Sequence, residues 1–185
     1  MIFINKRLIV ILFVLGASLG GWSASKSSTN MGSYSRAKAV IQPMKNQRVT
    51  GVFLFEQVGP GVMVTARLSG LVPNQAHGVH IHEWGDISDS TSGKSAGGHY
   101  NPEGHPHGRP PDFIRHAGAF GNIVANSRGD AVFRFLDTTI SILGIRNPIL
   151  GRSVVVHANP DTGEQPAGNA GPRIGVGVIG VIAPE

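Results

Sequence analysis

The histidines are the residues of this chain whose type and spacing could do chemistry. Seven of the eight fall between residues 77 and 116, and the eighth is His157. His80 and His82 form a His-x-His pair, and on a strand residues two apart point to one face, so both rings could meet one ion. Alone the pair is weak evidence, since strand histidines also serve packing. Neutral imidazole suits copper and zinc, and the chain has no cysteine thiolate to favour other metals.

The remaining histidines strengthen the metal interpretation. His99 lies in the segment 97–102 (GGHYNP), His107 follows eight residues later, and His116 nine residues after that. His157 ends the apolar run 154–156. One alternative is a histidine-rich loop that collects metals without catalysis.

Short apolar runs separated by turn residues must position these histidines. We expect strands at 37–41, 48–56, 62–68, 78–83, 122–126, 130–135, 153–157 and 173–181. No amphipathic helix is convincing, and the 26 glycines and 12 prolines indicate many turns. The pattern favours an all-β sandwich or barrel. The long loop from residue 85 to about 118 is functional or disordered.

The N-terminal 24 residues have the order of a secretory signal peptide. Lys6 and Arg7 precede an apolar run at 8–15, and small residues follow. An uncleaved N-terminal anchor is the alternative. Residues 25–36 are polar and predict a flexible linker, so the folded domain is 37–185. We therefore expect an exported protein, either periplasmic or extracellular, with no stable membrane partner unless the leader is retained.

Charge and cysteine content exclude several function classes. Loss of Lys6 and Arg7 lowers the formal charge from +5 by two, to +3. A moderate positive charge can attract small anions. The chain has no run of basic residues of the kind that indicates nucleic-acid binding. Without cysteine the chain has no disulfide, thiolate metal site or lipoprotein anchor.

Two segments resemble signatures of the Cu/Zn superoxide dismutase family. Residues 75–86 (QAHGVHIHEWGD) are similar to its copper-binding signature. Residues 168–173 (GNAGPR), followed by 177–180 (GVIG), are similar to its C-terminal signature. The similarity runs from about residue 37 to 181. It implies an eight-stranded Greek-key β-barrel or sandwich with long metal-binding and active-site loops.

The resemblance also implies roles for individual residues. Four histidines match the copper ligands, namely His80, His82, His99 and His157. Three histidines match the zinc ligands, namely His99, His107 and His116. Of these, His99 matches the ring that bridges copper and zinc. Arg173 matches the arginine beside copper, and His99 would carry a proton, so these two are the catalytic residues. Asp161 matches an aspartate that hydrogen-bonds a copper histidine and a zinc histidine; a simple turn residue is the alternative.

The chain departs from the family pattern at two places. Ala119 stands where the family has its zinc aspartate, so we expect zinc to bind weakly or not at all unless water or Asp112 substitutes. The family disulfide is also missing, with Gly93 and Val176 at the matching positions. Packing, copper binding or a partner subunit must then supply the equivalent rigidity.

The predicted function is copper-dependent dismutation of superoxide to oxygen and hydrogen peroxide. The alternative is a non-catalytic copper storage or delivery protein on the same fold. His77 matches a structural position and His105 matches no ligand. Several apolar residues could be core or a homodimer contact, namely Ile140, Ile142, Leu143, Ile145, Ile149 and Leu150.

Overall fold

A computed structural model describes residues 34–183 of the chain. The predicted signal peptide at 1–24 lies outside the described residues, as does the predicted linker except for its last three residues. Arg36, assigned to the linker, already begins the first strand. Within residues 34–183, no helix is long and apolar enough to cross a membrane.

Eight β-strands and one short 3₁₀ helix make up the described chain. The elements are β1 (Arg36–Pro43), β2 (Thr50–Val58), β3 (Gly61–Ser69), β4 (Ala76–His82), η1 (Lys94–Ala96), β5 (Ala119–Val124), β6 (Ala131–Asp137), β7 (Ser153–His157) and β8 (Arg173–Val181). Each expected strand is confirmed, β7 and β8 with the predicted bounds. β5 begins three residues earlier than expected, and η1 was not predicted.

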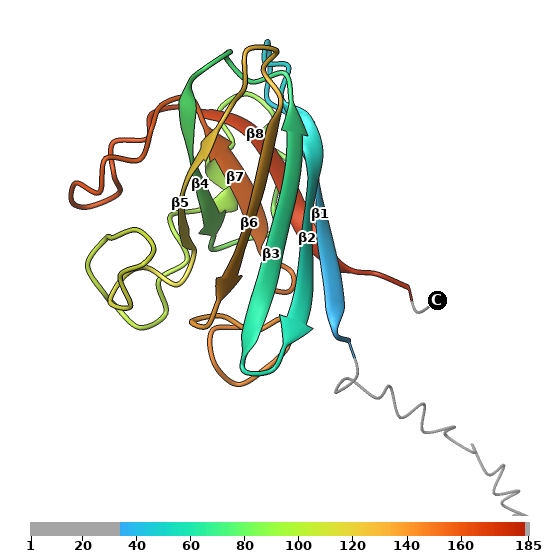
Figure 1. Ribbon diagram of the computed structural model, residues 1–185, viewed down its shortest axis with the longest axis vertical. Coiled ribbons are helices and arrows are strands. Elements are labelled where there is room, and N and C mark those ends of the chain that lie inside the picture. The colour runs from blue at the N-terminus through green and yellow to red at the C-terminus, as the bar shows by residue number, and fades with distance from the viewer. Residues whose placement is uncertain (1–33, 184–185) are drawn as a thin grey trace, which may run out of the picture. The chain divides into compact units, whose positions relative to one another are not determined.

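The strands form one antiparallel sheet that curls into a nearly closed barrel (Figure 1). Their order is β5-β4-β7-β8-β1-β2-β3-β6. The edge strands β5 and β6 lie against each other without sharing a hydrogen-bonded ladder. The chain crosses from β3 to β4 and from β6 to β7, as the predicted Greek key requires. The all-β barrel expectation is therefore confirmed.

Alternating side chains on the strands fill the barrel interior. On β2, Phe53 and Phe55 are buried, while Leu54 between them is only partly buried. The ring of Phe55 lies 6.4 Å from that of Phe120 on β5, which lies 5.3 Å from that of Phe135 on β6. These aromatic contacts join the two edge strands across the barrel interior, where burial of large apolar rings is the main stabilising contribution.

Strands β4 and β7 differ from the others because both of their faces are buried. Val79 and Ile81 of β4 join the barrel core, whereas His80 and His82 point to the opposite face. That outer face is covered by the β4–β5 loop and the β7–β8 loop, which Figure 1 draws in yellow-green and red beside β4, β5 and β7. The alternation on β4 thus presents its histidines to a space enclosed by loops.

Candidate metal centre

Four imidazoles converge on the outer face of β4. His80 and His82 come from β4, and His157 comes from the end of β7, which pairs with β4. His99 comes from the long loop, where it forms an isolated backbone bridge with His82. One nitrogen from each of the four rings lies within 4.8 Å of the others. The structure therefore brings together all four residues predicted to bind copper.

Backbone carbonyls fix two of these rings in one tautomer. The Nδ1–H of His82 donates to the carbonyl of Gly97, and that of His157 donates to the carbonyl of Gly171, both at 3.0 Å. A carbonyl only accepts hydrogen bonds, so in a neutral ring the Nε2 atom then carries a lone pair. The Nε2 atoms of His82 and His157 lie 3.4 Å apart. Two facing lone pairs at this separation are the arrangement that a cation between them stabilises.

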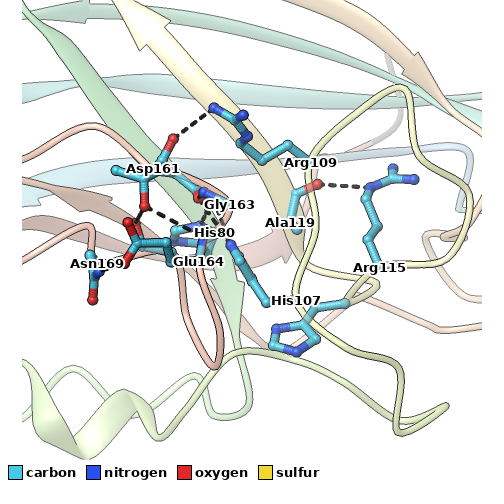
Figure 2. A network of polar contacts seen from close by, with 12 residues as sticks. His80, His107, Arg109, Arg115, Ala119, Asp161, Gly163, Glu164 and Asn169 are labelled. Carbon is cyan, nitrogen blue, oxygen red and sulfur yellow. Dashed lines mark hydrogen bonds and ion pairs between the residues drawn. The ribbon is translucent and has the colours of Figure 1, made fainter.

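One carboxylate orients two further rings, as Figure 2 shows around Asp161. The Nε2–H of His80 donates to Asp161 at 2.9 Å, and that of His107 donates to the same carboxylate at 3.0 Å. The Nδ1 atoms of both rings are buried and have no hydrogen-bond partner. Because a buried polar nitrogen is costly when unpaired, these two atoms fit a metal that accepts their lone pairs.

Asp161 is itself held tightly. Its backbone N–H donates to the side-chain oxygen of Asn122 at 2.7 Å, and its carbonyl accepts from the Asn122 amide and from Arg109, each at 2.9 Å. A Cβ on Gly168 would lie 2.1 Å from a carboxylate oxygen of Asp161, so glycine is required there. Asn122 and Arg109 are not predictable from the sequence, because neither lies in a recognisable ligand pattern.

A second histidine group contains the three residues predicted to bind zinc. His99, His107 and His116 offer nitrogens within 4.8 Å of one another, and the Nδ1 atoms of His99 and His116 lie 3.2 Å apart. Within residues 34–183 no carboxylate joins this group. Ala119 begins β5 and presents only a methyl group, and Asp112 is not among the residues brought together.

A third group combines His80, His107 and Asp161. Its nitrogens are the Nε2 atoms that already donate to the carboxylate. Asp161 therefore acts in the structure as a hydrogen-bonded link between the two histidine clusters. Taken together, the clusters are consistent with copper and zinc sites.

Burial keeps the imidazoles in their neutral, metal-binding form. It lowers the pKa of His157 to about 3, and repulsion from His80 adds to the effect. It lowers the pKa of His116 to about 4, again with a neighbouring imidazole contributing. The pKa values of His82 and His99 also lie well below the usual range, chiefly because of burial. A neutral ring at pH 7 has a lone pair for a metal.

Arg173 lies directly beside the four-histidine cluster. It is the cross-strand partner of His157, and its guanidinium donates to the carbonyl oxygens of Gly93 and Gly97. A cleft of about 310 Å³ is lined by His82, Gly98, His99, His157, Pro166, Ala167, Asn169, Ala170, Gly171 and Arg173. The cleft gives a small anion a path to the ring nitrogens past a fixed positive charge.

The remaining predictions for this region have clear outcomes. The chain has no cysteine, so no disulfide joins Gly93 to Val176. Instead, Val176 packs in a small buried cluster with Met44, Ala96 and Val155. His77 is buried and its Nδ1–H donates to the carbonyl of His157, which is a structural contact. His105 belongs to none of the metal-competent groups.

The fold and the site together define a β-barrel protein with histidine clusters suited to copper and zinc. Comparison with known proteins is consistent with this class. The family described as copper/zinc superoxide dismutase (SODC) matches residues 49–179. The chain belongs to this family, and the predicted superoxide dismutase activity is the activity of the family.

Individual relatives cover most of the chain. A protein named superoxide dismutase [Cu-Zn] from Paramecium bursaria Chlorella virus 1 is 39% identical over 181 residues, spanning 94% of this chain and 91% of the relative. Superoxide dismutase [Cu-Zn] 2 of Brassica juncea is 41% identical over 152 residues, 78% of this chain and 97% of the relative. The superoxide dismutase [Cu-Zn] of Humicola lutea is 39% identical over 153 residues, with corresponding shares of 78% and 98%.

Proposed function

We propose that the four-histidine cluster is the copper site at which this chain dismutates superoxide. Bound copper supplies the one-electron acceptor and donor that converts two superoxide anions and two protons into oxygen and hydrogen peroxide. The Nδ1 atom of His80 and the Nε2 atoms of His82 and His157 would hold it, together with Nε2 of His99. The supporting observation is that Arg173 lies beside His157 on the same cleft.

Arg173 would hold the incoming anion next to the ring nitrogens. A guanidinium keeps its proton at any working pH and can donate two parallel hydrogen bonds. Burial lowers the pKa of Arg173 from its ordinary value, but this group starts so high that it remains charged at neutral pH. A protein that only stores or delivers copper has no need of such a charge at the cleft.

His99 would carry one of the protons that the reaction consumes. It is the one ring shared by the four-histidine cluster and the group formed by His99, His107 and His116. Its Nδ1 atom lies 3.2 Å from the Nδ1 atom of His116, which leaves its Nε2 atom for the four-histidine cluster. We assign Nε2 of His99 as the atom that takes up and releases the proton.

Zinc would bind weakly in the group formed by His99, His107 and His116. Structural zinc takes four protein ligands, and this group offers three. A missing carboxylate also removes negative charge that would attract a divalent cation. Copper is therefore the metal on which we base the activity.

The exported location is also part of the proposal. It rests on the order of charged, apolar and small residues at 1–24, outside the described part of the chain. N-terminal sequencing of the protein recovered from its native compartment tests it. A chain beginning near residue 25 supports export with cleavage, and a chain that retains Met1 contradicts cleavage.

Substitution of Arg173 by alanine tests the assignment of the site. We expect the copper-loaded R173A variant to keep its copper and to react with superoxide on the order of tenfold more slowly, because the anion loses its guanidinium partner. Arg128, whose side chain is 80% exposed in the turn between β5 and β6, is the control, and R128A should leave the rate unchanged. Equal rates in R173A and the unmodified protein would remove Arg173 from the site.

A further inference from the structure

The orientation of Arg173 depends on two backbone carbonyls. Its guanidinium donates to the carbonyl oxygens of Gly93 and Gly97, which flank η1 in the β4–β5 loop. The loop has no covalent tie to β8, since the chain contains no cysteine. The position of Arg173 is therefore as well defined as the position of this loop, and other contacts must hold the Gly93 carbonyl in place.

Asp89 makes the contacts that define the loop around Gly93. Its carboxylate accepts the backbone N–H groups of Thr91, Ser92 and Lys94 at 3.0, 2.9 and 3.1 Å, and also the Ser92 hydroxyl. Its own carbonyl accepts the N–H of Gly93 at 2.9 Å. These bonds hold the residues on both sides of the carbonyl that faces Arg173.

The arrangement leaves little room for a side chain at residue 93. Gly93 has φ of 68°, and a Cβ there would lie 3.0 Å from Cδ of Arg173 and 3.2 Å from Cε of Met44. The backbone of Gly93 thus packs directly against the aliphatic part of Arg173. Close packing of this kind transmits a small displacement of the loop to the guanidinium.

The loop is also fastened to the barrel on its other side. The carbonyl of Ser90 accepts the backbone N–H of Lys45, which follows β1, at 2.8 Å. The N–H of Asp89 donates to the Ser95 hydroxyl at 3.2 Å, which in turn donates to the carbonyl of Asp86 at 2.9 Å. Asp89 therefore lies between a fixed barrel contact and the carbonyl that holds Arg173.

We propose that Asp89 is a positioning residue for the anion site, acting through the Gly93 carbonyl that holds Arg173 beside the copper histidines. The proposal rests on the proposed role of Arg173. Asp89 does not touch the cleft and has no part in ligating the metal. Its carboxylate supplies, through hydrogen bonds, part of the constraint that a covalent bridge would provide. Its negative charge also favours the charged form of Arg173, whose pKa it raises against the larger lowering effect of burial.

Azide binding to the copper-loaded full chain tests the proposal, because azide is a small anion that should use the same guanidinium. We expect D89A to retain its copper and to bind azide about fivefold more weakly, as the loss of an oriented hydrogen-bonding partner implies. The absorption change on azide addition gives the dissociation constant. D89N provides a second variant if D89A folds poorly, because its amide oxygen still accepts hydrogen bonds but its NH₂ group cannot accept the Lys94 N–H.

Asp86 offers a matched control in the same loop. Its carboxylate accepts the N–H of Ser88 at 2.8 Å and, among the described residues, makes no hydrogen bond with residues 91–94 or with Arg173. D86N should therefore bind azide as the unmodified protein does. Equal weakening in D86N and D89N would indicate a general loosening of the loop and would overturn the proposal.

A double-mutant cycle separates positioning from general loss of structure. If Asp89 acts through Arg173, D89A should have no further effect on azide affinity in the R173A background. An equal effect in both backgrounds would overturn the proposal. If R173A itself leaves azide affinity unchanged, the proposed role of Arg173 fails, and the role of Asp89 fails with it. If R173A weakens azide binding but D89A and D89N do not, only the role of Asp89 fails.

Discussion

At the scale of single residues, lone pairs define the metal centre. The carbonyls of Gly97 and Gly171 accept the ring N–H groups of His82 and His157, and the carboxylate of Asp161 accepts that of His80, which leaves the opposite nitrogen of each ring facing the cluster. This is the usual way in which protein groups outside the ligand set fix the tautomer of a metal-binding histidine. The ring nitrogens are therefore arranged for a cation before one binds.

Zinc affinity is the residue-scale prediction. We expect the unmodified protein to bind zinc weakly, since the group formed by His99, His107 and His116 includes no carboxylate within the described residues. The A119D variant should bind zinc at least about tenfold more tightly, because even groups outside the ligand set change metal affinity by about 10–100-fold. Competition with a chromophoric chelator measures both constants.

Asp112 supplies the control for this prediction. It lies in the same loop but outside the group, so D112A should leave zinc affinity unchanged. Tight equimolar zinc in the unmodified protein would contradict the prediction. If D112A then released the zinc, Asp112 would be identified as the substitute ligand.

At the scale of elements, the loops that cover β4 need their own anchors. Arg115, in the loop next to His116, donates to the carbonyl of Ala119 at 3.1 Å and to the carboxylate of Asp137 at 2.9 Å. Asp137 ends β6, and the exposed fractions of the two side chains are 5% and 0%. This buried ion pair ties the histidine loop to the edge strand of the barrel. Figure 2 shows the hydrogen bond from Arg115 to the carbonyl of Ala119.

Removal of Arg115 should be strongly destabilising. R115A leaves the Asp137 carboxylate buried without its partner, which typically costs about 3–5 kcal/mol. Urea denaturation of the metal-free protein measures the change as a lower midpoint at constant slope. R128A breaks only an exposed ion pair with Asp130 and should cost less than about 1 kcal/mol. Similar midpoints for the two variants would contradict the anchoring role.

The sequence predicts the elements well for a physical reason. Strands such as β2 carry buried apolar side chains at alternate positions, as at Phe53 and Phe55, whereas β7 is a continuous apolar run, and both patterns depend only on local sequence. The histidines that match the family signatures likewise come together in the structure. The partners of Arg173 were not predictable, because Gly93 and Gly97 act through backbone carbonyls. Asn122 and Arg109 act only because distant segments meet at Asp161.

At the scale of the whole molecule, the barrel turns a pattern along the sequence into a three-dimensional site. Three histidines of the four-histidine cluster lie on the paired strands β4 and β7, whose register is set by the hydrogen-bonded ladder. The fourth, His99, is bridged to His82 through the backbone. A rigid scaffold of this kind holds ligands close to one geometry, as a redox metal site requires.

The central claim is that His80, His82, His99 and His157 hold one copper ion that reacts with superoxide. The most direct test loads the purified protein with copper alone and measures bound copper and superoxide decay together, with H157A alongside. We predict one tightly bound copper per chain, decay well above that of the same copper in buffer, and loss of both properties in H157A. Decay no faster than with free copper, or an H157A variant that keeps both properties, would contradict the account.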